Sequence, residues 1–341
     1  MDVAIPISAS QLLADSLVWD NHACMPLRPS DEDYLPQIER YRDAGVDVVS
    51  LNVGYGDLDA ASHLRMLASF RRWFAARADR YVLAASVADI ERARRDNKLA
   101  ILFDVEGMGP LNDGDHGLVQ LFYDLGVRWM LIAYNKNTAA GGGCADEDPG
   151  LSDYGRQILG EMKRVGMVVC CSHTGHRTAL EVMAAADNPV IFSHSNAVAV
   201  HPHYRNIPDQ LIKACAGTGG VIGINGIGIF LGDNDNSPDA IVRHIDHVVQ
   251  LVGPDHVGVS LDYVFDQEEL LQALKDKPGI FPGMSSSANQ DLRMAAPECF
   301  LPVTEGLLRR GYREADVRKV LGGNWMRVAK QVWRQPADRP T

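Results

Sequence analysis

The sequence predicts an α/β protein that folds as a (β/α)8 barrel of the TIM type, with extra helices at its C-terminus. Short apolar runs alternate with helical patterns along the chain. The runs are rich in Val and Ile and lack polar alternation, which is typical of parallel strands buried on both faces. Residues able to bind metals follow several of the runs, where such barrels place their active sites. An open doubly wound sheet is the competing architecture.

The apolar runs predict eight strands within one hydrolase domain that spans residues 1–341. A chain of this length is ordinary for a single barrel domain. The expected strands cover residues 16–20, 47–52, 100–105, 127–134, 167–173, 189–194, 220–225 and 256–262.

Helices are expected between the strands. Ser152 has the character of an N-cap and Gly166 stands where a helix should stop, so a helix is predicted over Asp153–Val165. The segment 265–297 is rich in Gly, Pro and Ser in its middle, which predicts a long loop over the barrel mouth. Further helices are expected near residues 57–78, 87–96, 176–186 and 239–252, and two or three within 298–333.

The composition excludes several classes of protein. A net charge of −11 argues against a nucleic-acid partner, which requires a basic face. The N-terminus up to Asp15 lacks Lys, Arg and a long apolar run, so no secretory signal is expected. No stretch of the sequence approaches the roughly 20 apolar residues that a membrane span requires. Six scattered cysteines are too few for a disulfide framework in a chain of this size. We therefore expect a cytoplasmic protein with reduced thiols.

Histidines and acids that lie far apart in the sequence end or follow the predicted strands. Because the C-terminal ends of barrel strands meet at one rim, these side chains should converge. Imidazole, carboxylate and thiolate are zinc ligands, and two adjacent ions can activate water and polarise a carbonyl. The pattern therefore predicts a metal-assisted hydrolase. The residues are His22, Cys24, Glu106, His173, His194 and Asp262.

Some of these residues have simpler interpretations. A single histidine is more often a core or surface residue than a ligand, but His173 and His194 occur at the ends of successive predicted strands. Cys24 is either an inert packing thiol or a ligand that shares a face with His22 on an extended segment. Weaker candidates for contact with the site are Cys144, His201 and His203.

An ordered set of motifs resembles the renal (membrane) dipeptidase family of zinc peptidases, a branch of the amidohydrolase-like barrels. The resemblance extends from Asp15 to about Trp333, and the Ser-His-Ser and Arg-Asn-x-x-Asp motifs are the most specific. The matching pieces are Asp20-Asn21-His22-Ala23-Cys24, Val105-Glu106-Gly107, Leu125-Gly126-Val127-Arg128, Gly150-Leu151-Ser152, Ser172-His173, Phe192-Ser193-His194-Ser195, Arg205-Asn206-Ile207-Pro208-Asp209 and Gly322-Gly323-Asn324.

The resemblance implies two zinc ions, with one ion as the alternative. His22 and position 24 would bind one ion, His173 and His194 the other, and Glu106 would bridge them. Asp262 would be the catalytic acid and base. Arg205 would take the substrate's terminal carboxylate, for which a planar guanidinium is suited, unless it forms a surface ion pair. A homodimer is also what the family suggests.

Three positions depart from the family pattern. Cys24 stands where the family has Asp, and Tyr134 stands where it has a His that polarises the scissile carbonyl. Val264 stands where a second acid usually follows the catalytic one. A cysteine can still bind zinc and a tyrosine can still donate a hydrogen bond. The fold and metal site are therefore expected to carry over better than activity on ordinary dipeptides.

Three functions follow from these observations. The first is a zinc dipeptidase that cleaves a small peptide-like substrate with a free carboxylate, with Asp262 and Tyr134 in catalysis. The second is a hydrolase of another amide or ester, such as an N-acyl amino acid or a lactone. The third is a metal-poor barrel that binds a small molecule without turnover, which the three departures would favour.

Overall fold

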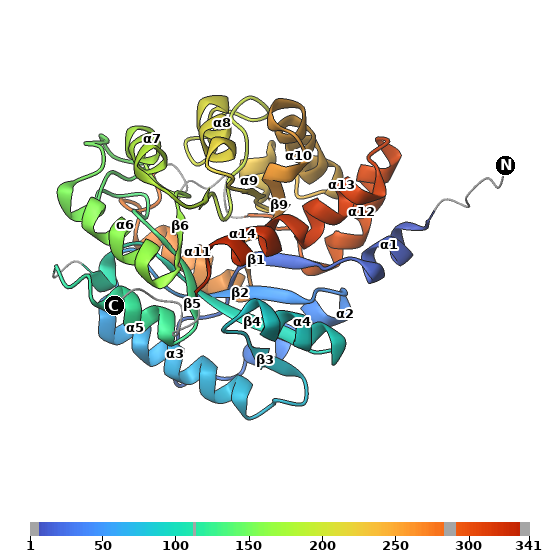
Figure 1. Cartoon of the computed structure of the whole chain (residues 1–341), viewed down its shortest axis with the longest axis horizontal. Coiled ribbons are helices and arrows are strands. Elements are labelled where there is room, and N and C mark those ends of the chain that lie inside the picture. Colours follow the sequence, from blue (N-terminus) through green and yellow to red (C-terminus); the bar gives the residue numbers. More distant parts are fainter. Residues whose placement is uncertain (1–6, 112–113, 283–290, 335–341) are drawn as a thin grey trace.

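The protein, seen here as a computed structural model, is described over residues 7–111, 114–282 and 291–334. Parallel strands lie at its centre and helices surround them (Figure 1). The main sheet runs in the order β10-β1-β2-β4-β5-β6-β7, with β3 paired to β4, and a second sheet joins β8 to β9. A bridge between Phe192 and Ile222 links the two sheets on one side. On the other side the Asp262 amide donates to the His22 carbonyl at 3.1 Å. These contacts close the curled sheet into a ring, as predicted.

The strands are short and almost fully buried, as expected for strands covered on both faces. Their bounds are β1 Trp19–Cys24, β2 Val48–Tyr55, β3 Tyr81–Leu83, β4 Leu99–Glu106, β5 Val127–Leu131, β6 Val168–Cys170, β7 Val190–Ile191, β8 Ile222–Ile224, β9 Val257–Val259 and β10 Tyr263–Val264.

The helix predicted over Asp153–Val165 begins and ends at the capping residues that the sequence indicates. The Ser152 hydroxyl accepts a hydrogen bond from the Gly155 amide, and Gly166 ends α6 in the left-handed conformation that glycine tolerates. The α-helices are α1 Ala9–Asp15, α2 Glu39–Asp43, α3 Ala60–Ala75, α4 Val87–Arg95, α5 Leu118–Asp124, α6 Asp153–Val165, α7 His176–Ala185, α8 Asp209–Gly217, α9 Gly228–Leu231, α10 Pro238–Val252, α11 Gln267–Asp276, α12 Phe300–Arg309, α13 Glu314–Arg318 and α14 Asn324–Val332. Among these described helices, none has both the length and the apolar character that crossing a bilayer requires.

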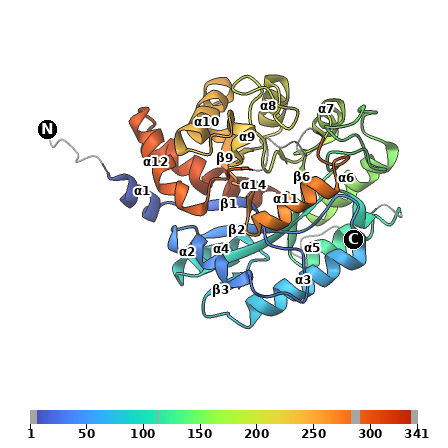
Figure 2. The same ribbon diagram turned by 180° about the vertical axis from the view of Figure 1, so that it is seen from behind.

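The two ends of the ring are covered by different helices. At the end where the strands begin, Trp325 of α14 packs with Trp19 and Trp129 in a buried apolar cluster. The Asn324 side chain donates to the Val257 carbonyl at 2.8 Å, which fixes α14 to the start of β9. The opposite end is crossed by α11, which Figure 2 shows in front of the strands. The strands' C-terminal ends therefore open into a space beneath α11.

The structure differs from the sequence prediction in several places, including a short strand, β10, after the eighth predicted strand. The first strand lies at Trp19–Cys24 rather than 16–20, because the ring buries and hydrogen-bonds the polar residues that made this stretch look like a loop. A short strand, β3, lies between the two helices predicted after the second strand. The predicted loop over the mouth contains the helix α11, whose first turn is capped by Asp266. Residues 283–290 of that predicted loop lie outside the described residues.

Candidate metal centre and substrate cavity

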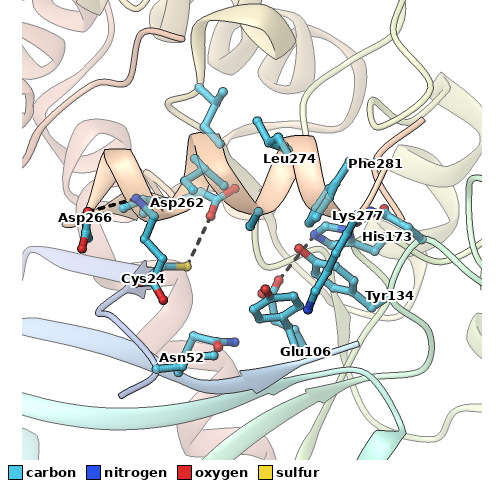
Figure 3. Close-up of a pocket in the computed structure, with 18 of the residues that line it drawn as sticks. Cys24, Asn52, Glu106, Tyr134, His173, Asp262, Asp266, Leu274, Lys277 and Phe281 are labelled. Carbon is cyan, nitrogen blue, oxygen red and sulfur yellow. Dashed lines mark hydrogen bonds and ion pairs between the residues drawn. The ribbon is translucent and has the colours of Figure 1, made fainter. Parts of the chain in front are cut away.

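A cavity of about 310 Å³ lies at the C-terminal ends of the strands, beneath α11. In Figure 3, α11 crosses the view, with Cys24, Asn52 and Glu106 below it. The predicted site residues Cys24, Glu106, Tyr134, His173, Arg205 and Asp262 all line this cavity.

His22 lies within β1 and is completely buried. Its Nδ1 is 3.2 Å from Asp104 Oδ1, and Asp104 also accepts a 2.6 Å hydrogen bond from the Ser50 hydroxyl. This pairing orients the ring so that Nε2 points to Glu106 Oε1 at 3.5 Å and to Asp262 Oδ1 at 3.4 Å. A carboxylate behind an imidazole is the usual support of a metal-binding histidine.

His173 and His194 are held in the same manner from the strand ends of β6 and β7. Asn135 Oδ1 accepts from His173 Nδ1 at 2.7 Å, and the Ser193 hydroxyl lies 2.9 Å from His194 Nδ1. Each ring therefore directs Nε2 inward, and the two Nε2 atoms are 2.9 Å apart. Three imidazoles thus present the same nitrogen to one point.

Glu106, at the end of β4, occupies that point. Its Oε1 lies 3.4 Å from His173 Nε2 and 3.2 Å from His194 Nε2. This oxygen is buried, and no hydrogen-bond donor satisfies it within the described part of the chain. A carboxylate oxygen that faces imidazole nitrogens without a hydrogen bond is the arrangement that a shared cation would stabilise.

Cys24 and Asp262 form the other side of the centre. Cys24 Sγ lies 3.4 Å from His22 Nε2 and 3.7 Å from Asp262 Oδ1. Asn225 donates to the second oxygen of Asp262 at 2.8 Å, which leaves Oδ1 directed at the centre. Ligand groups of one ion could be drawn from His22, Cys24 and Asp262, or from His22, Glu106 and His194, since the donor atoms within each set lie within 4.8 Å of one another.

The backbone at this rim adopts uncommon conformations. Asn135, His173 and Asp262 have φ values of 59°, 60° and 56°, in the left-handed region that side chains other than glycine rarely adopt. Such conformations persist where surrounding contacts over-determine them, and they often occur at functional sites. All three residues have a side chain fixed by a hydrogen bond near the centre.

Charge and burial set the protonation of these groups. Desolvation, together with the positive charge of Arg205, lowers the pKa of His173 to about 3, so this ring is neutral. Desolvation alone would raise the pKa of Glu106. The charge of His22 and the contacts with His173 and His194 outweigh desolvation and hold this pKa well below its ordinary value. An anionic Glu106 therefore faces a neutral His173. Burial raises the pKa of the Cys24 thiol to about 12, so a metal is needed to favour its thiolate.

Arg205 and Tyr134 border the cavity beside His173. Arg205 is only 4 % exposed, so the surface ion pair considered from the sequence is wrong. The described contacts of its guanidinium are the Phe230 ring at 5.6 Å and the Cys144 thiol rather than a carboxylate. The Tyr134 ring stacks on His173 with centroids 4.1 Å apart. Burial, followed by the charge of Glu106, raises the pKa of Tyr134 well above its ordinary value, which keeps its hydroxyl a donor.

The weaker candidates lie behind the site. Cys144 Sγ is 3.4 Å from Asn135 Oδ1, so the loop after β5 does bring this thiol close to the centre's supporting residues. His203 Nδ1 accepts from the Arg205 amide at 3.1 Å and its ring stacks on Tyr204. These contacts place His203 as support for the Arg205 backbone.

Sequence reasoning missed the supporting residues Asp104, Asn135 and Asn225. Asp104 had a visible signal, because it is a charged residue inside the apolar run that forms β4. Asn225 follows β8 directly and Asn135 lies four residues after β5, but asparagine at such positions is common in turns. Their roles become visible only when the partners 38 and 37 positions away are placed beside them.

A parallel barrel with imidazole, carboxylate and thiol groups converging at its C-terminal rim defines a hydrolase of the metal-dependent amidohydrolase type. The chain belongs to the membrane dipeptidase family, peptidase family M19, which it matches over residues 11–278. Membership of this family of metallopeptidases implies a bound metal.

Relatives and solved structures agree with this assignment. An uncharacterized protein in the pqqA 5′ region of Klebsiella pneumoniae is 33% identical over 284 residues, covering 80% of this chain and 96% of that protein. Dipeptidase tcpJ of Claviceps purpurea is 30% identical over 286 residues, and the match spans 80% of this chain and 62% of that longer protein. An amidohydrolase structure from Pseudomonas aeruginosa superposes with a TM-score of 0.87 at 28% identity, covering 96% of this chain and 99% of that one.

A more distant structure shows the same fold. A metallo peptidase from Rhodobacter sphaeroides, solved with a phosphinate mimic of the dipeptide L-Ala-D-Ala, superposes with a TM-score of 0.76. It is 21% identical and the match covers 94% of this chain and 100% of that one.

Proposed function

We propose that the protein is a zinc-dependent dipeptidase that cleaves a small peptide-like substrate carrying a free carboxylate. The observation that carries the proposal is the placement of Arg205, a buried cation, in the same cavity as the converging groups around Glu106. A guanidinium at this position can bind a carboxylate in a bidentate manner. The substrate would thus be held by its carboxylate while its amide bond lies over the centre.

Zinc fits the groups that converge here. Imidazole nitrogen, carboxylate oxygen and thiol sulfur are the donors that zinc takes, and donors of one tetrahedral ion lie roughly 3–3.5 Å apart. The distances of 3.2–3.5 Å among His22, His194, Cys24 and Glu106 fall in this range. We propose two ions, one at His22 and Cys24 and one at His173 and His194, with Glu106 shared. A single ion on His173 and His194 is the alternative.

The reaction would proceed by attack of water on the scissile carbonyl. Zinc, when bound, supplies Lewis acidity that activates water and polarises the carbonyl. Asp262 would accept the proton of the attacking water and pass it to the leaving amine. Asn225 holds its Oδ2, so its Oδ1 faces the centre, where it lies 3.4 Å from His22 Nε2. Tyr134 would donate a hydrogen bond to the developing oxyanion, and Arg205 would keep the substrate in register.

A second candidate, a hydrolase of N-acyl amino acids or lactones, is favoured by Tyr134 and Val264, which replace residues that the dipeptidase pattern carries. Hydrolysis of matched substrates decides between the two. The zinc-loaded protein should release alanine from leucyl-alanine faster than from N-acetyl-alanine, and leave a simple lactone intact. Preference for the acetylated compound or the lactone would reject the dipeptidase proposal in favour of the second candidate.

Two further expectations concern the whole protein. We propose a cytoplasmic location, supported by six free cysteines, and a homodimer, as the family resemblance suggests. Light scattering coupled to gel filtration of the zinc-loaded protein measures the second directly.

A further inference from the structure

The cavity has two unlike ends on either side of the metal centre. One end contains Arg205, whose charge acts on His173 and whose guanidinium lies against the Phe230 ring. The other end begins at Cys24, which contacts His22 and which Figure 3 shows on the opposite side of the cavity from His173 and Tyr134. A substrate anchored at Arg205 with its amide over the centre must direct its acyl half toward the Cys24 end.

The Cys24 end is built from apolar side chains. Val264 of β10 is the register partner of Cys24 in the parallel sheet, and it lines the cavity only partly buried. Leu27 lines the same space from the loop after β1. From above, the start of α11 contributes Leu270, next to Glu269, which pairs with Arg28 beside Leu27.

The acids near this end already have partners. Asp266 and Glu269 line the cavity, but Arg28 contacts Asp266 Oδ2 at 3.1 Å and Glu269 Oε2 at 2.8 Å. Val264 adds no charge where the family pattern has an acid. A basic side chain placed here would lose its hydration without gaining an unpaired carboxylate, which is unfavourable. An apolar side chain would instead remove Val264, Leu270 and itself from water.

We infer that the Cys24 end is an acyl-side subsite for a bulky apolar group, defined by Leu27, Val264 and Leu270. The preferred substrates are amides of an amino acid whose acyl half carries a branched or aromatic apolar side chain. Water cleaves the amide to a carboxylic acid and an amine, so the selectivity changes no step of the reaction. The inference rests on the proposed function, because the carboxylate at Arg205 sets the direction of the substrate.

The first test compares substrates on the unmodified zinc-loaded protein. The set is glycyl-alanine, leucyl-alanine, phenylalanyl-alanine and lysyl-alanine, which differ only in the acyl half. Burial of a large apolar side chain should raise kcat/KM for the leucyl and phenylalanyl substrates about tenfold to a hundredfold over glycyl-alanine. Lysyl-alanine should be no better than glycyl-alanine. Equal values for the glycyl and leucyl substrates, or a preference for lysyl-alanine, would overturn the subsite.

The second test moves the preference with variants of the wall. Val264→Asp and Leu270→Asn should each lower the leucyl-to-glycyl ratio of kcat/KM severalfold, and Val264→Asp should raise the relative rate with lysyl-alanine. The matched control is Gln272→Asn, on the exposed face of the same helix, which should keep the wild-type ratio. A ratio unchanged in both wall variants would contradict the assignment.

A binding measurement separates the subsite from the proposed activity. Phosphinate mimics of leucyl-alanine and glycyl-alanine are not hydrolysed, so calorimetry reports their affinity without turnover. The leucyl mimic should bind at least about tenfold more tightly. If dipeptides are not hydrolysed but this difference is found, the subsite stands and the proposed activity fails. If dipeptides are hydrolysed and the two mimics bind equally, the activity stands and the subsite is wrong.

Discussion

The floor and the roof of the cavity are held by different kinds of interaction. The floor consists of strand ends whose groups are buried, with His22 at 0%, His194 at 1% and Glu106 at 4% exposure. The roof, α11, is tied down by ion pairs of Arg28, whose side chain is 36% exposed, to Asp266 and Glu269. Buried hydrogen-bonded groups are costly to disturb, whereas exposed ion pairs contribute little because water screens them.

This difference suggests that the floor determines metal binding and catalysis, whereas the roof determines substrate preference. Each inward nitrogen of the floor is fixed by a second hydrogen bond, such as that between His22 and Asp104, so the ligand geometry exists before any ligand arrives. The roof presents apolar side chains on a helix with fewer constraints, which suits a surface that adapts to different substrates. Substitutions in the floor should therefore change metal binding and rate, and substitutions in the roof should change substrate preference.

The largest effect is expected at the centre of the floor. Glu106→Gln should remove the charge that the three imidazoles face, and should lower kcat/KM by more than the roughly 10–100-fold typical of a supporting residue. Zinc content should fall as well. Metal analysis and leucyl-alanine hydrolysis check both, with Cys24→Ala as the comparison. A loss in Cys24→Ala equal to or greater than that in Glu106→Gln would contradict the central place of Glu106.

Arg205→Ala should affect the substrate and not the metal. Loss of a charged bidentate donor costs about 1.5–3 kcal/mol, which corresponds to roughly 10–150-fold in KM for a carboxylate-bearing dipeptide. Zinc content should remain that of the wild type. Arg205→Lys is the matched control and should recover part of the affinity, because the charge stays but the planar fork is lost. Loss of zinc in Arg205→Ala would show that this residue belongs to the floor.

Asp104→Asn tests the support beneath His22 without touching the cavity. The amide keeps the shape but weakens the hold on Nδ1, so zinc affinity should fall about 10–100-fold. Competition with a chelator of known affinity measures this loss. Asn52→Ala removes a different donor to the same carboxylate and should cost less. Unchanged zinc affinity in Asp104→Asn would mean that His22 does not hold a metal.

Cys24 should set which metal the floor prefers. A thiolate ligand favours zinc over manganese or magnesium, because soft sulfur binds hard ions poorly. Cys24→Asp should therefore broaden metal tolerance while the site at His173 and His194 is kept. Activity after reconstitution with each metal is the measurement. Identical metal preference in the two proteins, together with no zinc–sulfur distance near the roughly 2.3 Å of thiolate ligation, would leave Cys24 outside the site.

The smallest effect is expected at the anchor of the roof. Arg28→Gln removes the ion pairs to Asp266 and Glu269, and exposed pairs contribute about 0–1 kcal/mol each. KM should rise no more than severalfold, with zinc content unchanged. The control is Arg92→Gln, which removes a comparable exposed ion pair to Asp89 on α4. Neither residue lines the cavity. A loss of zinc in Arg28→Gln would mean that roof and floor are coupled.

The sequence predicts the convergence of the inward-facing groups of the floor, because their signals are local, but not the residues that support them. His173 and His194 each follow an apolar run, and the barrel rule alone places such residues at one rim. The roof was not predictable in the same way. The helix α11 is followed directly by a stretch rich in glycine, proline and serine. This stretch led to the prediction of a loop for the whole segment. The support by Asn225 depends on a contact with Asp262 that no periodicity records.

The first strand illustrates a further limit. Asp20, Asn21 and His22 look like the polar end of a strand, yet they lie inside β1. Asp20 Oδ1 accepts from the Leu261 amide at 2.9 Å, and the Tyr41 hydroxyl donates to Oδ2 at 3.1 Å. Partners 241 and 21 positions away make this burial possible. Polar residues that seem to mark the end of a strand in the sequence can therefore lie within the strand in the structure.

The central claim is that the floor binds zinc and uses it to hydrolyse a carboxylate-bearing amide. Its most direct test is a titration of the chelator-treated protein with zinc, followed by the rate of leucyl-alanine hydrolysis. We expect no activity without metal and a rise that saturates at about two zinc ions per chain, as a shared carboxylate between two ions requires. Hydrolysis that persists after chelation, or a zinc-saturated protein that leaves leucyl-alanine intact, would contradict the claim.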